Sequence, residues 1–296
     1  MSAPPPSGRR LLGAGDVRRL AGELELHPAK RLGQNFVTDA NTVRRIARLA
    51  DVDADDVVLE VGPGLGSLTL ALLELGCRVI AVEVDDRLAR KLPGTVADFQ
   101  PDAAGRLVVL TRDAVTIDEL PEPPTALVAN LPYNVAVPVL INCLTKFPSL
   151  RRGTVMVQAE VADRLAAAPG DAAYGVPSVK TAWFARVRHS GAVPASVFWP
   201  VPRAGSGLVS FESTEPPATD VDRSAVFEVV DQAFSQRRKM LRTSLAKLFG
   251  SREAASAAVE RAGVRPDERP ERLGPREFAA IARELGASRA GASPDA

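Results

Sequence analysis

The stretch Glu60-Val61-Gly62-Pro63-Gly64-Leu65-Gly66 follows a β-branched run and precedes a segment, 67–75, with helical spacing of its apolar residues. Its three glycines let the backbone turn tightly and approach a ligand to a distance that a Cβ atom would prevent. The spacing is G-x-G-x-G with Ser67 next, which departs from the G-x-G-x-x-G of dinucleotide-binding enzymes. The sequence therefore predicts a strand, a ligand-binding loop and a helix.

Further apolar runs alternate with segments of helical period on both sides of this loop. They lie at 57–61, 78–83, 107–111, 126–130 and 154–158. Such alternation predicts βαβ units and a largely parallel sheet. Two later runs, 186–188 and 208–211, have no helical segment between them, so we expect an antiparallel addition at the edge of the sheet.

A change of pattern at Pro216-Pro217 marks a domain boundary. The segments 221–234, 239–249, 253–262 and 275–285 all have helical period, and no strand pattern follows. We therefore predict an α/β domain over 27–214 and a small all-helical domain over 215–286. Flexible tails are expected at 1–26 and 287–296.

The composition is that of an ordinary globular protein: 296 residues, 46% of them hydrophobic and 25% charged. No run approaches the ~18 apolar residues of a membrane span, and 1–8 lacks the apolar segment of a signal peptide, so we expect a cytoplasmic protein. Cys77 and Cys143 stand in apolar stretches and are predicted to be buried free thiols. His27 and His189 are the two histidines, and we predict no metal site.

Positive charge is clustered, although Lys and Arg total 37 against 36 Asp and Glu. The segment 235–247 holds five cations and no acid, and Lys30 and Arg31 form a second basic pair. Contacts with nucleic-acid phosphates need local clusters, which a whole-chain sum does not report. We therefore predict RNA binding by a set of six residues: Lys30, Arg31, Arg237, Arg238, Lys239 and Arg242.

Two acids follow neighbouring strands of the predicted sheet. Glu83 ends the second strand, where an acid is placed to accept hydrogen bonds from both ribose hydroxyls of a nucleoside. Asp113 follows the third strand, where its carboxylate could accept a hydrogen bond from an adenine amino group. With the glycine loop, these acids suit an adenosine that bears no phosphate, and they favour S-adenosylmethionine over NAD. The alternative is a simple turn beside two solvated acids.

The motif Asn130-Leu131-Pro132-Tyr133 ends the fourth strand. An adenine amino group is a poor nucleophile, and an enzyme that methylates it needs acceptors for the amino hydrogens. The Asn130 side-chain oxygen and the Leu131 carbonyl are the natural pair, Pro132 stiffens the turn, and the Tyr133 ring can stack on the base. Phe198 could close on the other face of the base. The alternatives are a helix-capping Asn130, a half-buried core Tyr133 and a proline-stiffened apolar loop around Phe198.

These motifs resemble one family, the small-subunit ribosomal RNA adenine dimethyltransferases, known as the kasugamycin-sensitivity enzymes. The resemblance runs from about 30 to 285 and keeps the family's order. The usual Pro-Lys-Val-Asp-Ser of the family stands here as Pro202-Arg203-Ala204-Gly205-Ser206. The matching segments are RLGQNF from Arg31, EVGPGLGSLT from Glu60, VIAVEVD from Val79, RDA from Arg112, NLPYNV from Asn130, MVQAEVADRL from Met156 and AFSQRRKMLRTSL from Ala233.

The resemblance implies a Rossmann-like class I S-adenosylmethionine-dependent methyltransferase domain, a mostly parallel sheet with an antiparallel edge strand, and a helical domain that docks RNA. The implied reaction is dimethylation of two adjacent adenosines near the 3′ end of 16S ribosomal RNA, on an assembling 30S particle, by a monomer. Tyr133 and Phe198 would flank the adenine. By the same resemblance the cofactor site is lined by Asn35, Val37, Gly62, Glu83, Asp113 and Asn130.

Three other functions stay open from the sequence. The first is a resistance-type methyltransferase acting on large-subunit RNA, which shares the cofactor loop and a similar N-x-P motif. The second is an RNA-binding assembly factor whose catalysis is dispensable. A dinucleotide oxidoreductase is the third, and the glycine spacing argues against it.

Overall fold

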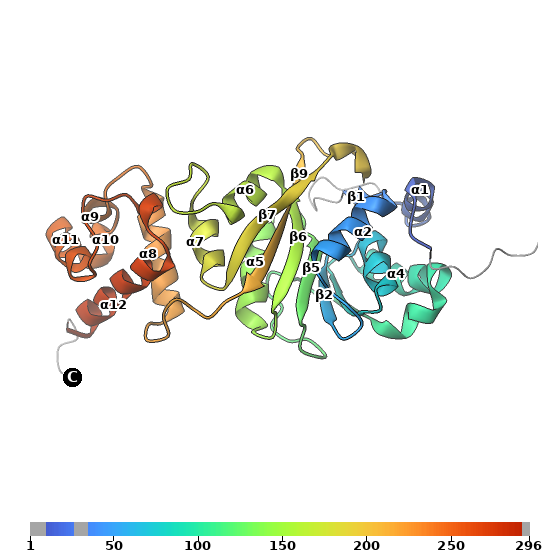
Figure 1. Ribbon diagram of the computed structural model, residues 1–296, viewed down its shortest axis with the longest axis horizontal. Helices are drawn as coiled ribbons and strands as arrows, with labels where there is room; N and C mark the ends of the chain where they lie inside the picture. Colours follow the sequence, from blue (N-terminus) through green and yellow to red (C-terminus); the bar gives the residue numbers. More distant parts are fainter. Residues whose placement is uncertain (1–9, 27–34, 292–296) are drawn as a thin grey trace, which may run out of the picture. The chain divides into compact units, whose positions relative to one another are not determined.

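The computed structural model describes residues 10–26 and 35–291 (Figure 1). These residues form two compact units. The sheet unit holds the described residues of Met1–Asp163 together with Val187–Ser213, and the helical unit holds those of Arg164–Arg186 and Thr214–Ala296. Each unit has its own cluster of buried apolar side chains.

A seven-stranded sheet has the order β4-β3-β2-β5-β6-β9-β7. Its strands are β2 (Val57–Val61), β3 (Arg78–Glu83), β4 (Leu107–Thr111), β5 (Ala126–Asn130), β6 (Arg152–Gln158), β7 (Ala185–Val193) and β9 (Ser206–Ser213). The pairs from β4 through β6 are parallel, whereas β9 runs antiparallel to β6. The predicted α/β class, with a mostly parallel sheet and an antiparallel addition, is confirmed.

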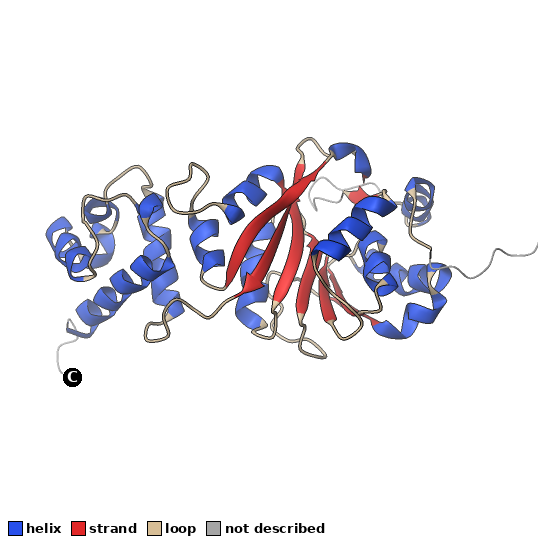
Figure 2. Cartoon of the chain, in the orientation of Figure 1, coloured by secondary structure: helices blue, strands red, loops and turns tan. Residues whose placement is uncertain are grey.

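Helices cover both faces of this sheet (Figure 2). They are α2 (Ala40–Leu49), α3 (Ser67–Glu74), α4 (Asp86–Phe99), α5 (Ala136–Lys146) and α6 (Ala159–Ala166), with 3₁₀ turns at Pro101–Arg106 and Ala195–Val197. The burial of the strands explains this arrangement. All five residues of β2 are buried, and a strand whose two faces are both buried must be covered by helices on each face.

The strand order reverses direction between β2 and β5. From β2 the chain proceeds outward to β3 and β4, and it then returns to place β5 and β6 on the other side of β2. In such sheets the carboxyl ends of the two central strands leave a crevice between their outgoing loops. The loop after β2 carries Gly62–Gly66, and β5 ends at Asn130. Both predicted motifs therefore lie at this crevice.

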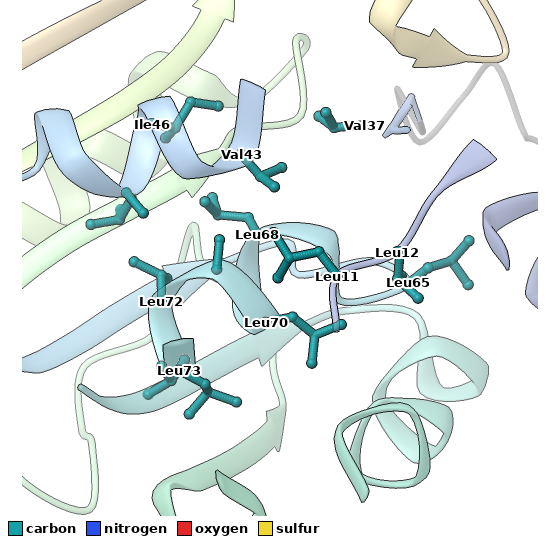
Figure 3. Packing of buried hydrophobic residues seen from close by; sticks show 14 of the residues in the cluster. Leu11, Leu12, Val37, Val43, Ile46, Leu65, Leu68, Leu70, Leu72 and Leu73 are labelled. Atoms are coloured by element: carbon teal, nitrogen blue, oxygen red, sulfur yellow. The ribbon is translucent and has the colours of Figure 1, made fainter. Parts of the chain in front are cut away.

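Residues 10–26 are a structured part of the sheet unit, so the predicted flexible tail over 1–26 is wrong for 10–26. Helix α1 (Ala14–Glu23) buries Val17, Leu20 and Ala21 on one face. Figure 3 shows Leu11 and Leu12 beside Leu65 and Leu70, and all of them belong to one buried cluster. Apolar residues spaced three and four apart explain why this helix packs against the core.

A two-stranded antiparallel ribbon was not predicted. It pairs β1 (Phe36–Val37) with β8 (Phe198–Trp199), so that Phe36 faces Trp199 and Val37 faces Phe198. Two strands of two residues each carry no readable alternation, which explains why the sequence pattern missed them.

The helical unit consists of α7 (Val176–Ala182), α8 (Arg223–Ser235), α9 (Leu241–Ser244), α10 (Ala246–Phe249), α11 (Arg252–Arg261) and α12 (Pro275–Gly291), with a 3₁₀ turn at Pro270–Arg272. Tyr174 and Trp183 belong to its core: the Tyr174 hydroxyl donates to the Leu273 carbonyl at 2.8 Å, and the Trp183 ring lies edge-on to Phe227. The predicted α/β domain over 27–214 includes 164–186, but the aromatic side chains of this segment pack with the later helices, and it belongs to the helical unit.

The predicted helix over 239–249 and the predicted tail over 287–296 need correction. The segment 239–249 is two short helices, α9 and α10, separated at Leu245. Met240 is extended (φ −66°, ψ 152°), so α9 begins only after it. Residues 236–239 are a turn after α8, so Arg237, Arg238 and Lys239 are not on a helix. Helix α12 continues to Gly291, so the predicted tail over 287–296 is helical as far as 291.

Candidate active site

The loop after β2 forms a glycine cradle. Gly62, Gly64 and Gly66 have φ of +67°, +58° and +99°, a region that residues with a Cβ rarely adopt. A Cβ at Gly64 would lie 2.9 Å from Cε1 of Phe36, and one at Gly66 would lie 2.7 Å from Cδ1 of Leu92. Both backbone conformation and space therefore require glycine at these two positions, as the sequence motif indicated.

Glu83 lies under this loop at the end of β3 and is 6% exposed. One carboxylate oxygen accepts from the Gly64 N–H at 3.2 Å, and the other accepts from the Asp85 N–H at 3.0 Å. Burial raises the pKa of this carboxyl above its ordinary value. Each oxygen keeps a further lone pair for a ligand hydroxyl. The position suits the predicted contact with a ribose.

Glu60 is a second buried acid in the same pocket, and the sequence pattern predicts no role for it. It is 1% exposed, and its Oε2 has no hydrogen-bond partner among the described residues. Burial raises the pKa of this carboxyl to about 8, and the neighbouring Glu83 acts in the same direction. Glu60 is therefore mainly protonated at neutral pH. The motif contained it, but an acid inside an apolar strand gave no separate signal of function.

A strap formed by Asn35–Thr38 crosses the site and is held from three directions. The Ser67 hydroxyl donates to the Val37 carbonyl at 2.7 Å, and the Asn130 amide nitrogen donates to the Asn35 carbonyl at 3.1 Å. The backbone N–H of Thr38 donates to the Val197 carbonyl at 2.8 Å. These bonds place the predicted residues Asn35 and Val37 in the wall of the pocket.

One pocket collects the glycine loop, the strap, Glu83 and the motif after β5. Of the residues predicted for cofactor or catalysis, it brings together Asn35, Val37, Gly62, Glu83, Asn130, Leu131, Pro132 and Tyr133. Residues that we had not singled out also line it: Phe36, Glu60, Ser67, Val84 and Leu88. Val84 is an apolar side chain that is 59% exposed, directly after Glu83.

Two predicted site residues do not line this pocket. Asp113 is exposed beyond the end of β4, and its carboxylate accepts from the Val115 N–H at 2.9 Å. Phe198 is 3% exposed and packs in the core, opposite Val37 in the β1–β8 ribbon, so in this structure its ring does not face the pocket. The buried position of Phe198 agrees with the alternative interpretation, in which this residue belongs to an apolar loop. Its contact with a base stays a prediction.

The predicted RNA-binding residues divide into four groups. Arg238 and Lys239 line a groove in the helical unit. Arg237 is held by its own unit, since its guanidinium lies 3.0 Å from Glu271 and donates to the Ala172 carbonyl at 2.7 Å. Arg242 is exposed, outside the groove lining. Lys30 and Arg31 lie outside the described residues.

The groove contains cations that the sequence did not single out. Arg252, Arg269 and Arg272 join Arg238 and Lys239 in its lining, against three acids, Asp267, Glu268 and Glu271. Arg269 and Arg272 stand with these acids in the mixed-charge segment 265–272, and Arg252 stands apart, so no run of cations reveals them. Folding alone makes them neighbours.

Within 10–26 and 35–291, no three His, Cys, Asp or Glu side chains gather in a way that could hold a metal ion. No helix among the same residues is long and apolar enough to cross a membrane.

The sheet order, the glycine cradle and the acid at the end of β3 define a class I methyltransferase whose methyl donor is S-adenosylmethionine. Two solved structures share the fold. A dimethyladenosine transferase from Plasmodium falciparum aligns over 86% of this chain and 98% of its own, with a TM-score of 0.73 and 21% identity. The 23S rRNA methyltransferase ErmE aligns over 85% of this chain and 99% of its own, with a TM-score of 0.61 and 26% identity.

The family follows from sequence comparison. The model of the ribosomal RNA adenine dimethylase family matches residues 27–286. "Ribosomal RNA small subunit methyltransferase A" of Thermobifida fusca is 61% identical over 274 residues, which are 92% of this chain and 96% of that protein. The protein of the same name from Kineococcus radiotolerans is 60% identical over 286 residues, 96% of this chain and 95% of that one. The chain belongs to the ribosomal RNA adenine dimethylase family, and the predicted enzyme class is confirmed.

Proposed function

We propose that this enzyme transfers methyl groups to the exocyclic amino groups of two adjacent adenosines near the 3′ end of 16S ribosomal RNA, in an assembling small subunit. One observation carries the proposal: the Asn130 amide is fixed at the pocket by its bond to the Asn35 carbonyl. The relatives named above as small-subunit methyltransferases support the choice of RNA. We propose further that it acts as a cytoplasmic monomer.

The pocket fits S-adenosylmethionine by its hydrogen-bond acceptors and its shape. The left-handed glycines leave the loop without side chains where a ligand must approach, and a Cβ at Gly64 would already meet Phe36. Glu83 offers a carboxylate for ribose hydroxyls, while the exposed Val84 offers an apolar surface for a purine. When bound, the cofactor supplies an electrophilic methyl group on its sulfonium. The predicted contact of Asp113 with the adenine amino group remains part of this proposal.

Asn130 and Leu131 would bind the target amino group through its hydrogens. The Asn130 nitrogen donates to the Asn35 carbonyl, so the amide oxygen is left to accept from the substrate. Acceptors at this point stabilise the charge that builds on the nitrogen as it is alkylated. No general base is needed before transfer, because the proton becomes acidic once the nitrogen is alkylated. Tyr133 would stack on the base, a contact worth ~1–3 kcal/mol.

The groove in the helical unit would bind backbone phosphates. Five cations line it against three acids, and all five, Arg238, Lys239, Arg252, Arg269 and Arg272, are exposed in this unit. Clustered cations bind RNA largely by releasing counterions, without sequence specificity. The groove would thus position the RNA, and selection of the adenosines would fall to the pocket.

Mass spectrometry and reverse-transcription mapping of ribosomal RNA would test this function. A strain that lacks the gene should lose dimethyladenosine from 16S RNA, and the wild-type gene should restore it. Loss of dimethyladenosine from 23S RNA instead would support the large-subunit alternative. The structural similarity to the 23S rRNA methyltransferase ErmE makes this the alternative to test. If a variant without activity restored normal subunit assembly, methyl transfer would be dispensable for that role.

A further inference from the structure

The phenol of Tyr133 is tied to a residue outside the motif that carries it. Its hydroxyl lies 2.6 Å from the Ser206 hydroxyl, and either oxygen can be the donor. Tyr133 lines the pocket and is half-buried, whereas Ser206 is 1% exposed and does not line it. The two residues are 73 positions apart in the sequence. Ser206 is therefore linked by a side-chain hydrogen bond to Tyr133, which lines the pocket.

Ser206 stands on a rigid support. It is the first residue of β9 and pairs with Gln158 at the end of β6, and the adjacent Gly205 carbonyl accepts from the Ala159 N–H at 2.9 Å. The next residue, Gly207, packs so closely on α6 that a Cβ there would lie 2.6 Å from Cβ of Ala162. These contacts hold the start of β9, and with it the Ser206 hydroxyl, against β6 and α6.

A hydrogen bond at the tip of the ring fixes the direction in which that ring points. The side chain of tyrosine turns about two torsions. Rotation about χ1 swings the hydroxyl away, whereas the hydroxyl lies on the axis of χ2 and stays in place when the ring turns about χ2. Tyr133 stands on the loop after β5, beyond the last sheet pair between Asn130 and Met156. Without an anchor, the ring could swing about χ1. The bond to Ser206 ties its tip to the sheet.

We infer that Ser206 is a positioning residue for methyl transfer, which holds the Tyr133 ring at the place where the target adenine stacks. The inference rests on the proposed function, in which Tyr133 contacts the base. Productive transfer needs the amino nitrogen in line with the methyl group, and a small misplacement of reacting atoms is costly. Ser206 contributes to the rate through orientation, and it leaves the cofactor contacts to other residues.

Three variants and a control test the inference. Ser206→Ala and Tyr133→Phe each remove one side of the bond, and Tyr133→Phe keeps the stacking ring. The third variant combines both changes. The control, Ser210→Ala, deletes a hydroxyl that is equally buried on the same strand but bonds to Thr154 and Ser190. Methyl transfer to small subunits from a strain without the gene gives kcat and KM, and thermal unfolding reports stability.

We expect each single variant to lower kcat by roughly three- to tenfold, the range of one hydrogen bond, with KM for S-adenosylmethionine within twofold of wild type. The double variant should be no slower than the slower single one, because both changes remove the same bond. Ser210→Ala should keep full activity. Wild-type kcat in Ser206→Ala, or multiplied effects in the double variant, would overturn the inference. Absence of transfer by the wild-type enzyme would instead refute the proposed function.

Discussion

The Asn130 side chain donates to the Asn35 carbonyl at 3.1 Å, across 95 residues of sequence. This bond joins the motif after β5 to the strap Asn35–Thr38. It also decides which end of the amide is left for a substrate, because the nitrogen is already engaged and the oxygen is the acceptor that remains. Recognition of an amino group thus depends on a carbonyl far away in the chain.

Replacing Asn130 tests this arrangement directly. We expect Asn130→Ala to lower kcat by at least ~100-fold, since the transition state loses an acceptor, with the Kd of S-adenosylmethionine changed only a few-fold. Asn130→Asp keeps the shape but cannot donate to the Asn35 carbonyl, so it should also be slow. Single-turnover transfer and calorimetric titration measure the two quantities. Unchanged turnover in Asn130→Ala would contradict the assigned role.

Gly64→Ala should abolish binding of S-adenosylmethionine. Gly64 has φ +58°, and the added Cβ would lie 2.9 Å from the Phe36 ring, so the loop or the strap must shift. Gly94→Ala is the matched control, because Gly94 lies in α4, at an exposed position with nothing within 4 Å of an added Cβ. The control should gain about 0.5–1 kcal/mol of stability and bind normally. Equal affinities of the two variants for S-adenosylmethionine would show that the glycine cradle is not required for binding.

Stability should fall as pH rises from 5.5 to 8.5, in part through Glu60. The pKa of this carboxyl is 4.5 ordinarily and about 8 in the folded protein. In that window the folded state holds a proton that the unfolded chain has lost, so rising pH favours unfolding until about pH 8. Glu60→Gln cannot titrate at this position. Between pH 5.5 and 8.5 its free energy of unfolding should therefore fall by roughly 3 kcal/mol less than that of the wild type.

Urea denaturation at the two pH values measures this difference. Glu119→Gln, at an exposed position of the same unit, serves as the control and should follow the wild-type pH dependence. If Glu60→Gln and the wild type lost the same stability between these pH values, Glu60 would not be the titrating group.

Removing cations from the groove should weaken RNA binding at low salt. A variant with Arg238→Gln, Lys239→Gln and Arg252→Gln is expected to bind ribosomal RNA ~10–100-fold more weakly, with a salt slope smaller by about two to three. The control removes three other arginines of the same unit, Arg261, Arg283 and Arg289, each of which is paired with an acid. An equal loss of RNA affinity in both variants would show that the net charge of the unit, and not the groove, determines binding.

The sequence by itself determined the α/β class, the glycine cradle and the acid at the end of β3. These features depend on local rules: strand and helix periods, the conformations open to glycine, and the fixed distance from one strand end to the next. It also determined the Asn130–Tyr133 motif, because those residues are adjacent in the chain.

The tertiary structure alone decided which distant groups complete the site. It pinned the strap to Ser67, joined Tyr133 to Ser206, buried Phe198 and packed α1 on the core. In the helical unit it gathered scattered arginines into one groove and turned Arg237 toward Glu271. No local pattern encodes such contacts. They arise when apolar faces pack together, and that packing brings polar groups from remote segments within hydrogen-bonding distance.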